Sequence, residues 1–108
     1  MSLQLGTLEE MILIILLMKD ETYGVEIAKE YKNQIGQSIS LPAIHVVLKR
    51  LEKKGFVSSR MGESTPERGG KGKRMYQATN KGYEVAQEIQ HARTKIWSTI
   101  PKLYFSVA

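Results

Sequence analysis

The sequence predicts a mainly α-helical domain that carries one two-stranded β-hairpin, and three observations predict it. Apolar residues recur at helical spacing in four segments: 8–19, 23–35, 40–54 and 81–100. Residues 56–61 and 73–79 read as two strands, because they flank a glycine-containing polar loop. A short turn with Gly36 joins the second and third helices, as in a helix-turn-helix. The order of these elements is that of a winged helix-turn-helix with a further helix after the wing.

Length and composition favour a folded protein without disulfide or thiolate chemistry. The chain has 108 residues, 42% of them hydrophobic, and no cysteine. The apolar run Met11–Met18 is much shorter than the roughly 20 residues of a membrane span. Acidic residues flank this run, whereas a signal peptide starts with basic residues. We therefore expect a soluble cytoplasmic protein.

The positive charge of the chain is concentrated in one region. The net charge is +5, and residues 49–74 hold nine basic and three acidic side chains. Residues 1–48 hold three basic and six acidic side chains, and residues 75–108 hold four and two. Such a patch is the electrostatic footprint of a polyanion-binding protein. A solvated lysine-rich surface has the same composition, so the patch alone leaves both interpretations open.

The first two helices are predicted mainly from their caps and apolar patterns. The helix at 8–19 is expected to begin with a capping box that joins Thr7 and Glu10. This helix is apolar on every side, so either it is a central core helix or a second copy of the chain covers part of it. Thr22 is the expected N-cap of the second helix. Gly24, in the first turn, indicates close approach of a neighbouring backbone.

The third helix, 40–54, has a buried stripe on one side and a basic, partly apolar face on the other. Ser40 is its expected N-cap, Pro42 is tolerated in the first turn, and Gly55 ends it. The buried stripe consists of Ile44, Val47, Leu48 and Leu51. The opposite face consists of Pro42, His45, Val46, Lys49 and Lys53. A face of this kind suits insertion into a DNA groove.

Val46 is the most informative residue of this face, because it is apolar where the helical pattern predicts an exposed position. Its methyl groups could meet the methyl group of a thymine in the major groove. Packing of Val46 against the second helix or against the wing is the alternative. The sequence does not decide between these two interpretations.

The wing is predicted to consist of the two strands and a loop at 62–72. Its tip carries cations on a glycine-rich backbone, so the segment 62–74 suits contact with DNA phosphates. These cations are Arg68, Lys71, Lys73 and Arg74. A disordered polar loop is the alternative for residues 63–67.

The last helix, 81–100, is expected to start at a Thr79 or Asn80 cap and to end at Pro101. Apolar residues recur along it at steps of three and four, close to a coiled-coil seam. The seam consists of Val85, Ile89, Ala92, Ile96, Ile100 and Leu103. Trp97 adds apolar surface beside it. We expect this helix to pair across a homodimer, and packing back on the first helix is the alternative.

Four segments together give a specific resemblance to a known family. They are LGTLEEMILIILL, TYGVEIAKE, VLKRLEKKGFV and RGGKGKRMYQATNKG, which span roughly residues 5–88. In these segments and their spacing the chain resembles the PadR family of bacterial transcriptional regulators, in the short-tailed branch with a single C-terminal helix. The resemblance implies a homodimeric winged helix that binds a palindromic operator, usually as a repressor. It also implies that the terminal helix packs against the partner's first and terminal helices.

The resemblance also assigns individual residues. Tyr23 matches the family's tyrosine at the start of the second helix, often near the DNA backbone. Lys49 and Arg50 match the Lys-Arg pair of the recognition helix. Lys73 and Arg74 match the basic entry to the second wing strand. The family commonly begins the recognition helix with Gly, a small hydroxyl residue, an apolar residue and Tyr, where this chain has Pro42, Ala43, Ile44 and His45. The family's tyrosine contact is therefore not carried over.

These observations give one set of predictions. A DNA-binding domain at 1–79 is followed by a dimerisation helix and tail at 80–108. The predicted DNA contacts are Tyr23, Ser40, Pro42, His45, Val46, Lys49, Arg50, Lys53, Arg68, Lys71, Lys73 and Arg74. The predicted dimer contacts are Leu8, Ile12, Val85, Ile89, Ala92, Ile96, Trp97 and Ile100. The expected partners are double-stranded DNA and a second copy, with an unidentified small-molecule effector at the dimer interface as a further option. Neither a cofactor nor a metal is expected.

Two other classes of function have to be compared with DNA binding. Some winged helices bind proteins instead of DNA, but here the basic excess coincides with the predicted groove-facing helix and wing. An enzyme is the least favoured class, because His45 and His91 are the only histidines and lie on different elements. No cysteine or paired-carboxylate pocket accompanies them. We therefore predict a sequence-specific DNA-binding regulator, and a protein-interaction module is the alternative.

Overall fold

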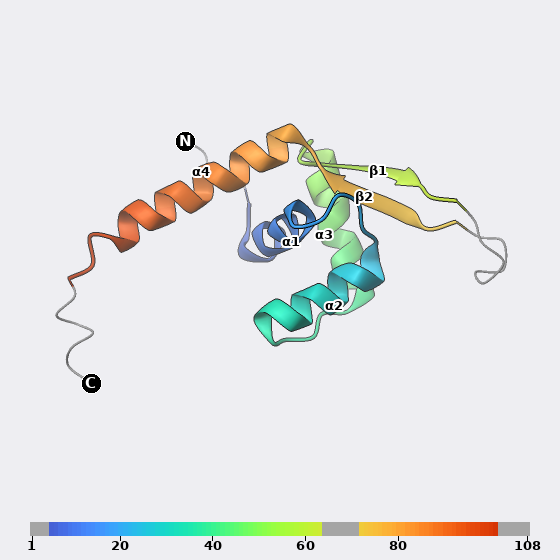
Figure 1. Ribbon diagram of the computed structural model, residues 1–108, viewed down its shortest axis with the longest axis horizontal. Helices are drawn as coiled ribbons and strands as arrows, with labels where there is room; N and C mark the ends of the chain where they lie inside the picture. Colours follow the sequence, from blue (N-terminus) through green and yellow to red (C-terminus); the bar gives the residue numbers. More distant parts are fainter. Residues whose placement is uncertain (1–4, 64–71, 102–108) are drawn as a thin grey trace.

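The computed structural model describes residues 5–63 and 72–101 and shows a mainly helical fold with one two-stranded antiparallel sheet (Figure 1). The elements follow the predicted order, which confirms the winged helix-turn-helix with a further helix. They are α1 (Thr7–Leu17), α2 (Gly24–Ile35), α3 (Leu41–Lys53), β1 (Val57–Met61), β2 (Arg74–Ala78) and α4 (Asn80–Trp97).

Helix α1 lies at the centre of the fold and packs against α2, α3, β2 and α4. Its side chains Ile12, Leu13 and Leu16 are almost completely buried. Ile15, also on α1, belongs to the same core. The rest of the chain completes the core with Ile27, Ile44, Val47, Leu48, Leu51, Phe56, Val57, Tyr76, Val85, Ala86 and Ile89. The chain therefore covers most of α1 itself, and the interpretation of a central core helix holds.

The predicted caps of α1 and α2 are both wrong: another local cap replaces the first, and a tertiary contact engages the residue predicted for the second. Gly6, not Thr7, is the N-cap of α1, and its N–H donates to the Glu9 carboxylate at 3.0 Å. Tyr23, not Thr22, is the N-cap of α2. Thr22 instead forms an isolated β-bridge with Tyr76, so its backbone belongs to the edge of the wing. For Thr22, the backbone contact with the distant Tyr76 therefore overrides the local cap pattern.

The predicted ends of α3 and the predicted start of α4 are confirmed. The Ser40 hydroxyl accepts a hydrogen bond from the N–H of Ala43 at 3.3 Å. Gly55 has a φ of +83°, a left-handed conformation that other residues adopt only with strain. The Thr79 hydroxyl accepts from the N–H of Gly82 at 3.1 Å and donates to the carbonyl of Gly55 at 2.8 Å. One threonine thus joins the end of α3 to the start of α4.

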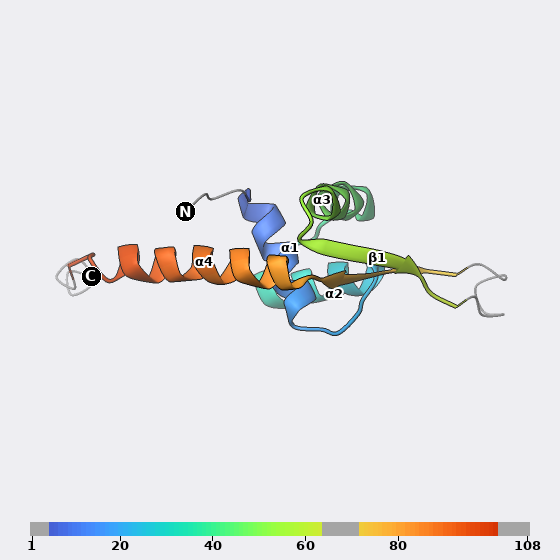
Figure 2. The same cartoon turned by 90° about the horizontal axis from the view of Figure 1, so that it is seen from above.

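The wing strands match the predicted segments to within one residue at each end. They pair from Val57 with Ala78 to Met61 with Arg74. The wing and the far end of α4 extend from the helical body in opposite directions (Figures 1 and 2). The two predicted working surfaces, one for DNA and one for a second copy, therefore lie at different ends of the molecule.

Helix α4 is buried in its first half and exposed in its second. Gly82, Val85, Ala86 and Ile89 lie in the core. A Cβ atom on Gly82 would collide with the carbonyl oxygen of Phe56, so α4 approaches the wing base too closely for a side chain. In the part of the chain that the structure describes, no helix is long and apolar enough to cross a bilayer.

Candidate nucleic-acid interface

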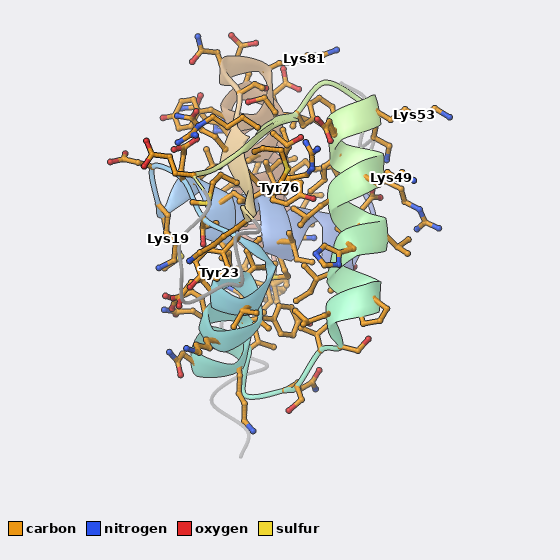
Figure 3. The ribbon with its side chains drawn as sticks, turned by 90° about the vertical axis from the view of Figure 1, so that its right-hand side faces the viewer. Lys19, Tyr23, Lys49, Lys53, Tyr76 and Lys81 are labelled. Atoms are coloured by element: carbon orange, nitrogen blue, oxygen red, sulfur yellow. The ribbon has the colours of Figure 1, made fainter. Side chains whose placement is uncertain are left out.

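The outward face of α3 is open to solvent, as the pattern predicts. The Val46 side chain is 51% exposed, so it packs neither against α2 nor against the wing. Pro42, Lys49 and Lys53 are also exposed. Both lysines point away from the body of the protein (Figure 3). The face combines cations, which suit phosphates, with apolar groups, which can contact the methyl group of a thymine.

His45 lies on the flank of α3 that faces the start of α2. Its Nε2 atom lies 3.0 Å from the position that a Cβ on Gly24 would occupy, and Leu41 Cδ2 lies 3.6 Å from it. Gly24 therefore marks a close approach, but the neighbours are side chains and not the predicted backbone. His45 is held beside the first turn of α2, where a helix presents unpaired N–H groups.

A cleft separates α3 from the wing, and a chain of hydrogen bonds crosses it. The cleft is lined by His45, Lys49, Glu52, Ser59, Arg74 and Tyr76. Ser59 donates to the Glu52 carboxylate at 2.7 Å, and Arg74 Nη1 donates to the Ser59 hydroxyl at 3.0 Å. Burial raises the pKa of Tyr76, so its hydroxyl stays neutral at neutral pH. These two hydrogen bonds connect α3 to both wing strands across the cleft.

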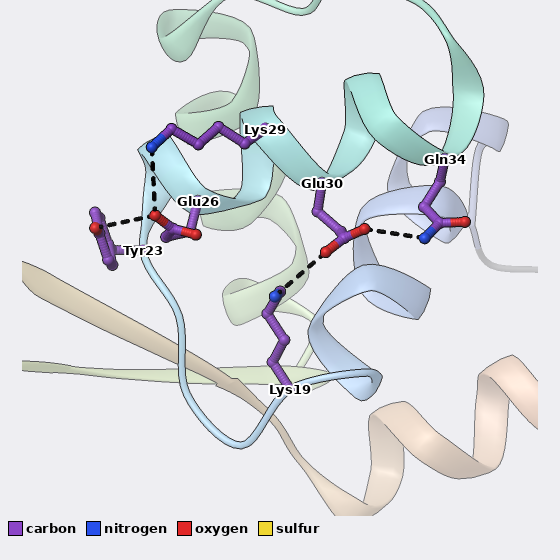
Figure 4. Close-up of polar contacts among 6 residues, drawn as sticks. All are labelled: Lys19, Tyr23, Glu26, Lys29, Glu30 and Gln34. Atoms are coloured by element: carbon purple, nitrogen blue, oxygen red, sulfur yellow. Dashed lines mark hydrogen bonds and ion pairs between the residues drawn. The ribbon is translucent and has the colours of Figure 1, made fainter.

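Tyr23 lies where α2 begins and contacts the wing. The Lys73 ammonium group lies 3.6 Å from the centre of the Tyr23 ring, a cation–π contact. The Tyr23 hydroxyl donates to Glu26 Oε1 at 3.3 Å, and Lys29 lies 3.7 Å from the same oxygen (Figure 4). Two of the predicted DNA contacts, Tyr23 and Lys73, are thus brought together.

A second group of polar contacts holds the middle of α2 against the end of α1. Lys19 pairs with Glu30 at 3.3 Å, and Gln34 donates to the same carboxylate at 2.9 Å (Figure 4). The Gln34 hydrogen bond, followed by Lys19, lowers the pKa of Glu30. Both acidic residues of α2, Glu26 and Glu30, are thus engaged in polar contacts within the protein.

Arg50 is exposed but lies on the flank of α3 toward α1. Burial opposes ionisation of the nearby Glu9, but the Gly6 N–H, Lys54 and the charge of Arg50 outweigh it and lower the pKa of Glu9. Lys54 pairs directly with this carboxylate at 2.9 Å. Arg50 is therefore less directly aligned with the outward face than Lys49.

The remaining predicted DNA contacts are placed as follows. Ser40 is exposed at the start of α3, and Arg74 is exposed on β2. Arg68 and Lys71 lie outside the described residues. The structure thus brings α3, the start of α2 and the base of the wing to one side of the molecule.

The predicted dimer contacts separate into two groups. Ile12, Val85 and Ile89 are buried in the chain's own core, so they are not available to a second copy, and this corrects their assignment. The first half of the α4 seam faces α1. Packing within one chain and packing between two chains use the same spacing of apolar residues, so the sequence pattern did not distinguish them. The others are at least partly exposed: Leu8, Ala92 and Ile100 are half-buried, and Ile96 and Trp97 are 66% and 64% exposed.

None of the ion pairs among the described residues was predicted, including two that connect segments far apart in the sequence. Arg93 on α4 binds the buried Glu10 on α1, with Nη1 donating to Oε2 at 2.9 Å. Arg60 on β1 binds Glu21 through two hydrogen bonds of 2.7 and 2.6 Å. Each pair joins residues far apart in the sequence, and no local pattern signals such a contact.

Comparisons with known proteins agree with this geometry. The family model of the PadR-like transcriptional regulators matches residues 12–88. A PadR-like regulator from Bacillus cereus is 25% identical, with a TM-score of 0.73 and coverage of 92% of each chain. A PadR family regulator from Clostridium difficile is 25% identical, with a TM-score of 0.71 and coverage of 93% of this chain and 98% of that one.

A third similar structure was solved with nucleic acid. Bacillus subtilis PadR in complex with operator DNA is 27% identical, with a TM-score of 0.67. The match covers 78% of this chain and 46% of that one. None of the curated proteins compared with the sequence matches it.

Proposed function

The chain belongs to the PadR-like family of transcriptional regulators, and we propose that it binds a palindromic operator as a homodimer and represses transcription there. Members of this family are transcriptional regulators, not enzymes. The observation that carries the proposal is the exposed face of α3 beside the wing, where Val46, Lys49 and Lys53 reach solvent together. The similar protein from Bacillus subtilis, solved with operator DNA, supports DNA as the partner.

In this proposal α3 enters the major groove and its first turns read the bases. Pro42 and Val46 present apolar surface, and a valine methyl in the groove favours a thymine. His45, on the flank, contacts a phosphate or a base edge near the start of α2. Pro42 and His45 stand where the family commonly has glycine and tyrosine, so the operator is expected to differ from those that its relatives read.

The remaining contacts of the proposal hold the DNA backbone and set the register. Lys49, Arg50 and Lys53 on α3 lie beside the groove walls, and Ser40 lies at the N-terminus of the helix. The wing segment 62–74 follows the phosphates with its cations, together with Tyr23 at the start of α2. The cations of this wing segment are Arg68, Lys71, Lys73 and Arg74. Such contacts supply affinity without sequence preference.

The second half of α4 is the proposed dimer contact, so that 1–79 binds DNA and 80–108 joins the two copies. Ile96 and Trp97 expose a large apolar area at this end of the helix. Ala92 and Ile100 complete the contact on α4, and Leu8 joins it from α1. An aromatic side chain at such a position is ordinary interface packing, and we prefer this role for Trp97. A small-molecule effector held between the two terminal helices is the second option.

Two single substitutions separate base reading from phosphate binding. In gel shifts with DNA from upstream of the protein's own gene, Val46→Ala is expected to weaken operator binding about fivefold, or about 1 kcal/mol. Its binding to random DNA should stay unchanged. Lys53→Ala is expected to weaken both, and to reduce the slope of log K against log salt by about one.

The outcome of this comparison also tests the alternative function. If the wild type bound all sequences only at micromolar or weaker affinity, and Val46→Ala left this binding unaltered, the protein-interaction module would be favoured. Equal losses on operator and random DNA for Val46→Ala would remove Val46 from the reading face.

A further inference from the structure

Three consecutive residues, just before α2, hold the wing to the helical body. Glu21 accepts two hydrogen bonds from Arg60 on β1, at 2.6 and 2.7 Å. Thr22 exchanges backbone hydrogen bonds with Tyr76 on β2, at 3.0 and 2.7 Å. The Tyr23 ring lies under the Lys73 ammonium group, 3.6 Å from it. The segment therefore contacts both strands of the wing.

The contacts of residues 21–23 extend farther toward the tip of the wing than the buried residues that attach the wing to the core. The buried wing residues Val57 and Tyr76 anchor its base. Arg60 and Met61 lie toward the far end of β1 and are exposed, and the wing projects away from the helices there (Figure 1). A two-stranded ribbon alone is only marginally stable in water, so its direction depends on side contacts. The Glu21–Arg60 pair is the outermost of these contacts on β1.

The charge of Glu21 is at first sight unfavourable for a DNA-binding protein. The hydrogen bonds from Arg60 lower the pKa of Glu21, so the carboxylate is ionised at neutral pH. A negative charge beside the wing repels phosphates, and it also neutralises a wing arginine. Removing this charge alone should therefore strengthen DNA binding, unless the carboxylate has a structural role in placing the wing.

We propose that Glu21 is a positioning residue for DNA binding: through Arg60 it holds the wing at the angle at which the wing cations reach the DNA backbone. The inference rests on the proposed function, because it assumes that the wing contacts DNA. It adds a role for an acidic residue that touches no DNA and for the segment 21–23 as the support of the wing. If the Glu21 charge acts only by repelling phosphates, losing the carboxylate should raise the affinity for DNA. If the carboxylate positions the wing, losing it should lower that affinity.

The test compares Glu21→Gln with Glu63→Gln in the full-length protein, using operator DNA over a range of salt concentrations. Glu63 also lies on the wing and is exposed, and among the residues that the structure describes it makes no hydrogen bond or ion pair; its charge acts on Arg60 only at a distance and less than that of Glu21. Glu21→Gln is expected to bind operator about five- to tenfold more weakly, with a salt slope lower by about one or more. Glu63→Gln, which removes the same charge, is expected to bind as tightly as wild type or more tightly.

A charge exchange distinguishes positioning from direct contact. The double variant Glu21→Arg with Arg60→Glu rebuilds the pair in reverse, and is expected to recover most of the lost affinity and slope. Arg60→Glu alone is expected to bind more weakly than the double variant. Thermal unfolding should change little for Glu21→Gln, because the pair is exposed, so a loss of affinity does not reflect unfolding.

Two results for Glu21→Gln would overturn the inference. One is binding as tight as that of the wild type or tighter, and the other is a loss of affinity with an unchanged salt slope. The variant Lys53→Ala tests the proposed DNA-binding function independently of the positioning role of Glu21. If Lys53→Ala weakens binding and Glu21→Gln does not, only the positioning role fails. If wild type shows no sequence preference and Lys53→Ala has no effect, the proposed function fails, and the inference fails with it.

Discussion

Replacing Ile96 with aspartate is expected to convert the proposed dimer into a monomer and to lower operator affinity by about a thousandfold or more. A monomer presents one recognition helix, so roughly half of the binding free energy of a specific complex is lost. The Ile96 side chain is 66% exposed in the single chain, so the substitution costs little in the folding of the monomer. Light scattering after gel filtration and a gel shift on the same samples measure both effects.

Ile35→Asp is the matched control for this prediction. Ile35 is also exposed at the end of a helix, but it lies on α2, away from α4. This variant should remain dimeric and keep wild-type affinity. A monomeric wild type, or an Ile96→Asp protein that stays dimeric and binds operator normally, would contradict the proposed interface.

Replacing Arg93 with alanine is expected to lower the free energy of unfolding by about 2–3 kcal/mol, because it leaves the Glu10 carboxylate buried without its partner. The Glu10 residue is only 1% exposed. The loss is smaller than for a fully buried pair, because the Arg93 side chain is 51% exposed and water reaches it. At a fixed protein concentration the midpoint of thermal unfolding should fall by about 10 °C.

A second substitution shows whether the unpaired charge of the buried Glu10 carboxylate causes the loss of stability. Glu10→Gln in the Arg93→Ala background removes the charge and is expected to recover much of the lost stability. Glu10→Leu in the same background should do so as well, since apolar replacements of a buried pair are often neutral. An Arg93→Ala protein that unfolds at the wild-type temperature would show that the pair contributes nothing measurable.

The parts of the fold that follow from local chemistry could be predicted from the sequence. The Ser40 cap, the left-handed Gly55 and the Thr79 cap each depend on residues within a few positions, and each is confirmed. Both wing strands were also located to within one residue of their ends. The helical spacing in α3 likewise placed Val46 on an exposed face.

The errors arise where a distant residue changes the outcome. Thr22 is a good cap by type, but its backbone bridges to Tyr76 across the fold. Glu10 is the right residue for a capping box with Thr7, but it is buried and binds Arg93 instead. A pattern of neighbouring residues carries no information on partners more than 50 positions away.

The assignment of the α4 seam shows a different limit. Apolar residues at steps of three and four mark a face that must be covered, and they do not say by which chain. Val85 and Ile89 are covered by the chain's own core, while Ile96 remains largely exposed. The division falls in the middle of one uninterrupted pattern, so only the three-dimensional structure locates it.

The central claim is that the protein reads a palindromic operator as a dimer, and selection of DNA from a random pool tests it most directly. The purified protein is expected to enrich an inverted repeat whose half-site centres lie about one helical turn, or a multiple of it, apart. Thymine should be enriched at one position in each half-site, and Val46→Ala should relax that position. Failure to enrich any sequence, or enrichment of a single unpaired half-site, would contradict the account.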